Sequence, residues 1–361
     1  MSYSMKKLFS ALSGAAALLA VTGMLAGCAK PGEAAPSSDA EGPLLMTNET
    51  SVVCDVEPDY IFTYAENQTE DYPTTQGAYR FAQLVNERTE GRIQIRVYAN
   101  SELGDEQSTI RQLQFGGIDF VRCSMSTMSP YSDMANLLML PYLYRDADHM
   151  WNVLEGDIGR QVADSFVEEG IVPLAWYDAG VRSFYFKTPV STKEDMEGLV
   201  IRVQPNEMME DMVELLGASA LPVAYENVYS AIQQGEADGA ENNWSSYDAM
   251  HHDKVAPYYL LDEHMRVPEM QMISGVTWEI LSEEDREIIR ECAAQSADYE
   301  RMLWTAREEE ARQRVLSQGC SEITLSEEEK KKFHDAMEPL YVKYCGNYMD
   351  LVEQIRMMGE E

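Results

Sequence analysis

The fold is decided by the stretch from Gly198 to Asn243, GLVIRVQPNEMMEDMVELLGASALPVAYENVYSAIQQGEADGAENN. It begins with a β-type run, Leu199 to Val203, which Pro205 ends because proline cannot donate to a sheet ladder. Apolar residues then recur at helical spacing as far as Gly217, which suits a left-handed helix cap. A second strand, a second helix and a third strand are predicted at 221–224, 228–235 and 238–239. The stretch therefore predicts a βαβαβ unit.

Polar side chains fall at the strand ends of this unit. In open α/β sheets a ligand binds outside the carboxyl ends of the strands, where Arg202, Tyr225 and Asn242 are expected. The planar fork of arginine donors grips two carboxylate oxygens at once, which lysine cannot do. Arg202 is therefore predicted to bind a carboxylate ligand, and an ion pair with a surface acid is the alternative.

A similar succession of elements precedes this stretch. From Asp59 onward, strand, helix, strand, helix and strand are predicted at 60–65, 76–89, 93–99, 106–115 and 118–124. Two such lobes with a crevice between them are the architecture of a binding protein. We therefore expect an α/β fold with two lobes and a ligand cleft between them.

The segment that starts at Ser282 contains no glycine or proline before Gly319. Ser282 and the acidic residues up to Asp285 are typical of a helix start. A continuous helix over 282–318 would be about 50 Å long, which exceeds one lobe, so it would span both lobes or project from them. Two helices with a break near 295–296 are the alternative.

Length and charge limit the class of protein and of partner. The chain has 361 residues, 45% of them hydrophobic, which is enough for two domains or one large domain. Its net charge of −34 excludes nucleic acids and anionic membrane surfaces as partners, because both would repel it. A small anion is compatible with this charge, because distant charges are screened within about 8 Å and arginines in a cleft act locally.

The first 28 residues resemble a bacterial export signal with a lipobox. Lys6 and Lys7 precede an apolar run that ends in LAGC at 25–28. This pattern implies cleavage before Cys28 and attachment of lipid, including palmitate, to that residue. A transmembrane helix is the weaker alternative, because the run is rich in Ala, Gly and Ser and a tether-like segment at 29–48 follows it.

Cysteine and histidine spacing indicates no metal site. Five cysteines follow the signal, at 54, 123, 292, 320 and 345, and we expect buried free thiols, with a Cys320–Cys345 disulfide as the alternative. No GxSxG, HExxH or Walker pattern occurs in the sequence. We therefore predict a protein without metal, cofactor or catalytic residues.

Motifs along most of the chain resemble the substrate-binding proteins of TRAP transporters, the DctP family. The resemblance runs from about Tyr60 to Met349, with Val200 and Asn227 standing where lysine and glutamate are usual. Beside GLVIR and LGASALPVAYENVYSAIQQGEADGAENN, the motifs are ELG at 102–104, LPYLYRDADHMWNVLEG at 140–156, YDAGVRSFY at 177–185 and EH at 263–264.

This resemblance implies a ligand site formed by both lobes. Arg202 would clamp the ligand carboxylate and Asn242 would hydrogen-bond to it. Arg182 would be a second arginine contact, with a hinge salt bridge as the alternative, and Tyr225 would line the pocket unless it is a core aromatic. The remaining predicted contacts are Asn67, Glu106, Arg122, Ser124 and Trp244.

Two of these predicted contacts carry specific expectations. Arg122 lies inside a predicted strand, where a charge is costly unless it is paired, so we expect it to snorkel or to meet an anion. Trp244 closely follows Asn242 and is expected to cover the face of a sugar.

The resemblance also implies domains and a function. The expected parts are a signal at 1–27, a tether at 28–55, lobe I at 56–179 and 268–305, and lobe II at 180–267 and 306–361. The protein would be a lipid-anchored extracytoplasmic monomer without enzyme activity that delivers a small organic acid, first a hexuronate or related sugar acid, to TRAP membrane subunits. The alternatives are a C4-dicarboxylate ligand, an extracellular sugar-acid enzyme that uses Glu106 and Glu241, and a ligand-sensing lipoprotein.

Overall fold

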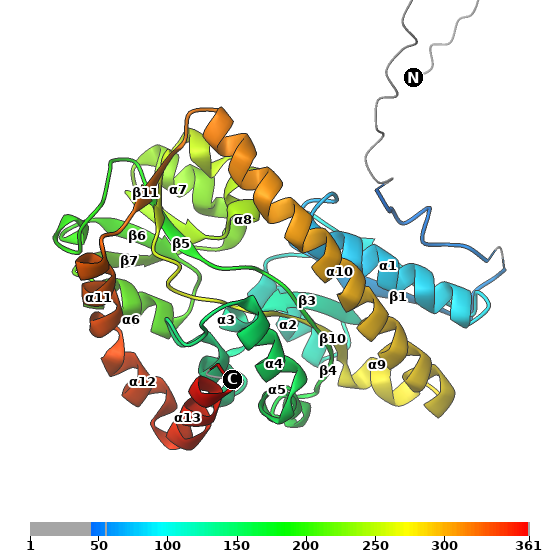
Figure 1. Cartoon of the computed structure of the whole chain (residues 1–361). Coiled ribbons are helices and arrows are strands. Elements are labelled where there is room, and N and C mark those ends of the chain that lie inside the picture. The colour runs from blue at the N-terminus through cyan, green and yellow to red at the C-terminus, as the bar shows by residue number, and fades with distance from the viewer. Residues whose placement is uncertain (1–44, 55, 360–361) are drawn as a thin grey trace, which may run out of the picture. The chain divides into compact units, whose positions relative to one another are not determined.

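The computed structural model describes residues 45–54 and 56–359, which form two mixed β-sheets covered by helices (Figure 1). In the first sheet, of order β2-β1-β3-β10-β4, β1 is parallel to β2 and β3, and β10 is antiparallel to β3 and β4. Helices α1 (Pro73–Arg88) and α2 (Glu106–Gln114) connect the parallel strands, which confirms the predicted βαβαβ order. The strands are β1 (Tyr60–Ala65), β2 (Ile93–Tyr98), β3 (Phe120–Ser124), β4 (Ile171–Tyr177) and β10 (Glu269–Ser274).

The second sheet has the order β11-β9-β5-β8-β6-β7. Its strands are β5 (Ser183–Phe186), β6 (Val200–Val203), β7 (Ser219–Pro222), β8 (Gly239–Asn242), β9 (Tyr258–Leu261) and β11 (Ser321–Thr324). Helices α6 (Glu207–Leu215) and α7 (Val228–Gln234) separate β6, β7 and β8, so the second βαβαβ prediction is also confirmed. β7 starts two residues earlier than predicted, because its pairing with β6 runs from Val200–Ser219 to Val203–Pro222.

The chain passes between the sheets by two short connections and one long helix. The connections β4 to β5 and β9 to β10 lie side by side, since Arg182 and Met265 form an antiparallel bridge. Gly180 in the first connection has φ 62°, and a Cβ there would come within 3.0 Å of Trp304 Nε1. Only glycine combines this φ with so close a neighbour.

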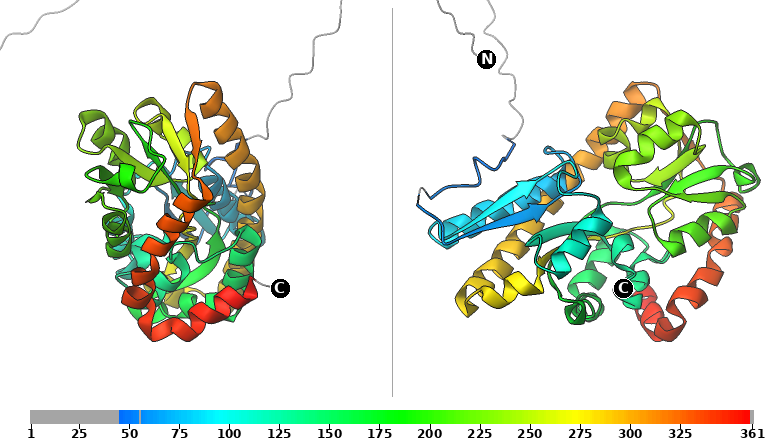
Figure 2. Two further views of the ribbon diagram at one scale, coloured as in Figure 1. Left: turned by 60° about the vertical axis from the view of Figure 1, so that its left-hand side comes forward. Right: turned by 180° about the vertical axis from the view of Figure 1, so that it is seen from behind.

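The long helix is α10 (Glu283–Ser317), a single helix of 35 residues, so the predicted continuous helix is confirmed and the alternative, a break near 295–296, is wrong. Ser282 caps it by accepting a hydrogen bond from Asp285 N. At 1.5 Å per residue it is about 52 Å long. It packs against α1 and β4 of the first sheet and against α8 (Trp244–Ala249) of the second, so it spans both (Figures 1 and 2). This spanning helix was predicted.

The C-terminal helices join the two halves at a different place. Helix α12 (Glu338–Cys345) packs against α6 and against the 3₁₀ segment Asp133–Met139, and α13 (Met349–Met358) packs against α4 (Ala147–Glu155). The predicted lobe boundaries near 180 and 268 fall in the two short connections. The assignment of all of 306–361 to lobe II stays a prediction.

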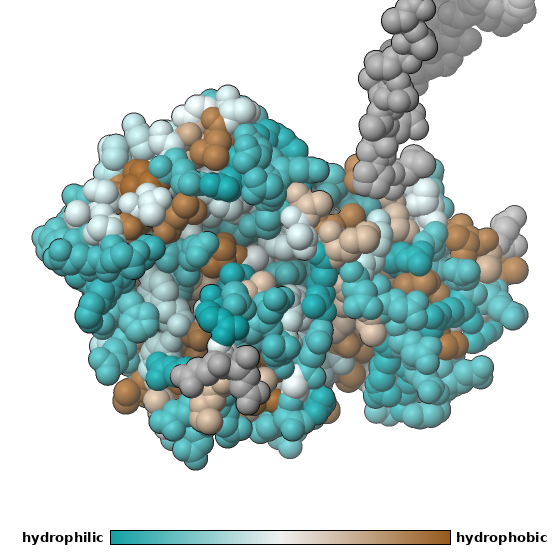
Figure 3. All heavy atoms as spheres, in the orientation of Figure 1, coloured by the Kyte–Doolittle hydropathy of each residue, from teal (hydrophilic) through white to brown (hydrophobic). Residues whose placement is uncertain are grey.

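The described surface is mostly hydrophilic on the face that Figure 3 shows, with hydrophobic residues in small separate groups. The five cysteines at 54, 123, 292, 320 and 345 are free, and three of them, Cys123, Cys292 and Cys345, are buried as expected, whereas Cys54 and Cys320 are partly exposed. Among the helices of the described residues, none is long and apolar enough to span a membrane. The predicted signal at 1–27, Cys28 and most of the tether lie outside the described residues.

Candidate ligand-binding site

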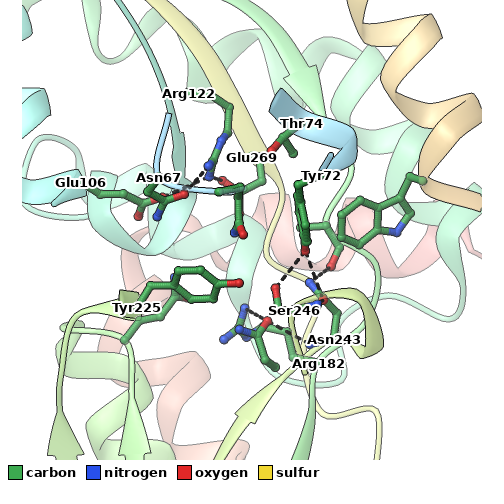
Figure 4. A pocket seen from close by; sticks show the side chains of 15 residues that line it. Asn67, Tyr72, Thr74, Glu106, Arg122, Arg182, Tyr225, Asn243, Ser246 and Glu269 are labelled. Carbon is green, nitrogen blue, oxygen red and sulfur yellow. Dashed lines mark hydrogen bonds and ion pairs between the residues drawn. The ribbon is translucent and has the colours of Figure 1, made fainter. Parts of the chain in front are cut away.

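Two adjoining cavities lie between the sheets, at the ends of β1, β3, β6 and β8. Figure 4 shows the residues that line the cavity beside Arg182. The cavity beside Arg182 has a volume of about 20 Å³ and the cavity beside Arg202 about 50 Å³. Asn67, Glu106, Gln204 and Tyr225 line both. These volumes hold a few water molecules, whereas ligand pockets usually enclose about 300 to 1,000 Å³. A ligand as large as a sugar therefore requires the walls to move apart.

The two walls touch each other directly. Tyr72, which precedes α1, places its hydroxyl 2.8 Å from Ser246 Oγ on α8. Asn206, at the start of α6, donates to Ser126 O and Ser129 Oγ, both at 2.9 Å. These contacts join the halves of the protein without any backbone pairing, so they can break without unfolding either sheet.

Arg202 is buried on β6 without a carboxylate partner among the described residues. Its Nε and Nη2 donate to Val223 O at 2.8 and 2.6 Å, and Nη1 has no hydrogen-bond partner there. Burial lowers the pKa of this guanidinium. Arginine nevertheless stays protonated in proteins, so the cavity beside Arg202 contains an uncompensated positive charge.

Arg182, in contrast, is already paired. Its Nε and Nη2 bind the carboxylate of Glu241, with Nη2 2.9 Å from Oε1, and its Nη1 donates to Asn242 Oδ1 at 2.9 Å. His264 lies behind this pair, 3.7 Å from Glu241 and 2.8 Å from Asp262. The expected alternative for Arg182, a salt bridge at the hinge, is therefore present, while the residue also lines the smaller cavity.

The charges behind Arg182 shift two pKa values. Burial alone would raise the pKa of Glu241, but Arg182 and His264 outweigh burial and lower that pKa to about 2. Burial alone would lower the pKa of His264, but Asp262 and Glu241 outweigh it and raise that pKa to about 9. At neutral pH this cluster consists of two cations and two anions.

His264 predicts a loss of stability at alkaline pH. The pKa of His264 is about 9 in the folded protein, against 6.5 for the unperturbed side chain of the unfolded chain. The contribution of His264 to the free energy of unfolding is therefore complete below pH 6.5 and is lost as the pH rises through 9. We expect this loss to lower the free energy of unfolding in urea by about 3 kcal/mol between pH 6 and pH 9.5, in addition to the loss from Glu106, whose raised pKa of about 8 lies in the same range. His264→Gln should remove the part of the fall that comes from His264. His334→Gln, which changes an exposed ring, should retain it, and an unchanged fall in His264→Gln would contradict the pairing.

Arg122, on β3, is surrounded by three carboxyl groups. Its Nε donates to Glu66 at 3.0 Å, and its Nη1 donates to Glu269 at 2.7 Å and to Glu106 at 3.1 Å. Burial and the neighbouring Glu269 raise the pKa of Glu106 to about 8. The anions that we expected beside Arg122 are thus supplied by the protein, and its contact with a ligand stays a prediction.

Uncharged polar atoms also face the cavities without partners among the described residues. They are Gln68 Oε1, Thr74 Oγ1, Tyr225 OH and Trp304 Nε1. Burial raises the pKa of Tyr225 to about 12, so its hydroxyl stays neutral and can donate. Buried polar groups are rarely left unpaired, and together these four provide donors and acceptors that suit hydroxyl groups.

The comparison with known proteins agrees with this geometry. Residues 64–347 match the DctP family, described as bacterial extracellular solute-binding protein, family 7. The chain belongs to this family. This family 7 solute-binding protein is 37% identical over 282 residues to a solute-binding protein of Chromohalobacter salexigens, across 78% of this chain and 83% of that one.

Solved structures of TRAP periplasmic solute-binding proteins resemble this family 7 protein closely. One from Xanthobacter autotrophicus Py2, with bound β-D-galacturonate, has 37% identity and a TM-score of 0.80. One from Roseobacter denitrificans, with bound β-D-glucuronate, has 35% identity and a TM-score of 0.79. Each match covers 82% of this chain and 99% of the other.

Most residues predicted for the site of this family 7 protein lie together, and two do not. Arg182, Arg122, Asn242, Asn67, Glu106 and Tyr225 line the smaller cavity, and Arg202 lines the larger one. Ser124 lines neither cavity, and its hydroxyl is 2.9 Å from Ser126 Oγ and 3.5 Å from Gln204 Oε1. Trp244 stacks on Tyr259 in the hydrophobic core, with ring centroids 3.5 Å apart. Trp244 lines neither cavity, and its contact with a sugar stays a prediction.

Sequence reasoning missed several residues that line the cavities. They are Gln68, Tyr72, Thr74, Ala179, Gln204, Asn243, Ser246, Glu269 and Trp304. Asn243 directly follows β8, so the rule of strand ends could have found it, whereas Ser246 lies on α8. Glu269 begins β10, which no strand prediction covered.

Proposed function

We propose that this family 7 solute-binding protein captures a hexuronate or a related sugar acid outside the cytoplasmic membrane. The observation that carries the proposal is the buried guanidinium of Arg202, which has no carboxylate partner among the described residues and lines the larger cavity. The adjoining smaller cavity is lined by residues with unpaired uncharged polar atoms. A ligand with one carboxylate and several hydroxyl groups matches both features. The bound galacturonate and glucuronate in two similar proteins support this choice.

In this proposal the arginines have different roles. Arg202 clamps the ligand carboxylate. Arg182 and Asn242, which are hydrogen-bonded to each other at 2.9 Å, use their remaining donors to bind the ligand from the same wall. Tyr225 lies between the two cavities and contacts the ligand ring. Binding requires the walls to separate and close again about the two short connections, while α10 bends.

The cellular setting follows from the family and from the sequence of the first 28 residues. We propose that the protein is a monomer held by lipid on Cys28 at the extracytoplasmic face of the membrane, and that it passes its ligand to TRAP membrane subunits. Its ligand leaves unchanged, because the role of the family is solute binding. Incubation with galacturonate followed by mass analysis of the solute checks this: a converted product would favour the enzyme alternative.

The ligand class can be tested by thermal unfolding. Galacturonate or glucuronate should stabilise the protein, and the matching neutral hexose should not, because Arg202 needs a carboxylate. At about a hundredfold excess over the dissociation constant the stabilisation should be about 2.7 kcal/mol. A clear shift with succinate or malate and none with either hexuronate would instead support the C4-dicarboxylate alternative.

A further inference from the structure

The two walls of the cleft carry opposite balances of charge. On the first-sheet wall, Arg122 stands among Glu66, Glu106 and Glu269. On the second-sheet wall, the buried Arg182 and Arg202 are accompanied by one buried carboxylate, Glu241, since the charges of His264 and Asp262 cancel. Among the buried groups, carboxyl groups therefore outnumber guanidinium groups on the first wall, and the reverse holds on the second; the less buried Asp105 and Glu226 also line the larger cavity.

Glu269 is the carboxylate that brings the negative charge to the cavity surface. Its Oε2 accepts from Arg122 Nη1 at 2.7 Å, and the residue lines the smaller cavity with a side chain that is 10% exposed. Glu66 is fully buried and lines neither cavity. A ligand group that reaches the first wall beside Arg122 can therefore contact Glu269 but not Glu66.

A carboxylate at this position distinguishes sharply between ligand groups. It can only accept hydrogen bonds, so a ligand hydroxyl can donate to it and form a strong charge-assisted bond. A ligand carboxylate has no proton to donate and adds like charge in a desolvated cleft. Arg122 offsets little of this repulsion between carboxylates, because its guanidinium already binds three protein carboxyl groups.

We propose that Glu269 is a specificity-determining residue that admits hydroxyl groups and rejects a second carboxylate, so the site selects monocarboxylic sugar acids over the corresponding diacids. This inference rests on the proposed function, in which the ligand carboxylate lies at Arg202 on the opposite wall. The unpaired hydroxyl of Thr74 and amide oxygen of Gln68 lie on the same wall as Glu269 and suit the same hydroxyl groups.

Calorimetric titration with galacturonate and with galactarate, the matching diacid, tests the inference. The parent protein should bind galacturonate at least about 30-fold more tightly, a difference of about 2 kcal/mol. Glu269→Gln keeps an acceptor for Arg122 but removes the charge, so galactarate should gain affinity and the ratio should fall at least fivefold. Glu291→Gln makes the same change of net charge at an exposed surface pair and should leave the ratio within about twofold.

The possible results separate this inference from the proposed function. Equal binding of the two acids by the parent, or no gain of galactarate affinity in folded Glu269→Gln, would overturn the role of Glu269 while the hexuronate site stands. Failure of the parent to bind galacturonate and glucuronate would overturn the proposed function, and the inference with it.

Discussion

Arg202→Lys should weaken hexuronate binding by about 30-fold to several thousandfold, which corresponds to about 2 to 5 kcal/mol. The substitution keeps the positive charge but loses the planar fork that grips two carboxylate oxygens. In the present arrangement Nε and Nη2 bind Val223 O and leave Nη1 for another acceptor. A lysine amine presents its three donors from one atom and cannot reproduce the planar pair of donors that meets two carboxylate oxygens.

Titration of the folded variant with galacturonate gives the result directly. Its free energy of unfolding must be compared with that of the parent first, because Arg202 lies inside a core strand. Arg88→Lys, at an exposed pair with Glu291, is the matched control and should bind as the parent does. If folded Arg202→Lys binds within about threefold of the parent, a loss below about 1 kcal/mol, the clamp is wrong.

Arg122→Met should destabilise the fold by about 3 to 5 kcal/mol, because it leaves Glu66 and Glu269 buried without their common partner. The pairing carboxylate of Glu66 is wholly inaccessible and Arg122 is 1% exposed, so water cannot replace the lost contacts. Urea unfolding at pH 7 measures this loss. Arg88→Met removes a pair whose side chains are 31% and 58% exposed, and should cost less than about 1 kcal/mol.

A second substitution checks the cause of that loss. Arg122→Met combined with Glu66→Gln removes the cation and the carboxylate nearest to it, so part of the stability should return relative to Arg122→Met alone. A double variant as unstable as the sum of the two single variants would show that the pair itself contributes little, and that Arg122 acts through packing.

Local periodicity was sufficient to predict the framework but not the partners of the charged residues. The spacing of apolar residues and the glycines at 91, 217 and 235 predicted the order of both βαβαβ units, with element ends displaced by up to three residues, as at the start of α1 and the end of β8. The absence of glycine and proline predicted α10. These signals arise within one element, where neighbours in sequence are also neighbours in space.

The identity of the ion partners depends instead on contacts across the whole chain. Arg122 and Glu269 are 147 positions apart and meet only because β10 enters the first sheet antiparallel beside β3. Tyr72 and Ser246, 174 positions apart, meet only where the two walls touch. Trp244 illustrates the same difficulty. Its position in the sequence is compatible with a ligand contact and with a place in the hydrophobic core, and only the structure shows its stacking on Tyr259.

Because the guanidinium of Arg202 is unpaired among the described residues, the free energy of closing the cleft should depend on whether an anion is bound. Shutting the cleft around a lone cation removes that charge from water without compensation, which is costly, so the empty protein should favour the open arrangement. An anion removes this penalty and shifts the population toward the shut form, whereas a neutral sugar of the same shape leaves the penalty in place. A membrane partner that binds only the closed form would then bind the ligand-loaded protein and not the empty protein. Such a partner would need no contact with the ligand.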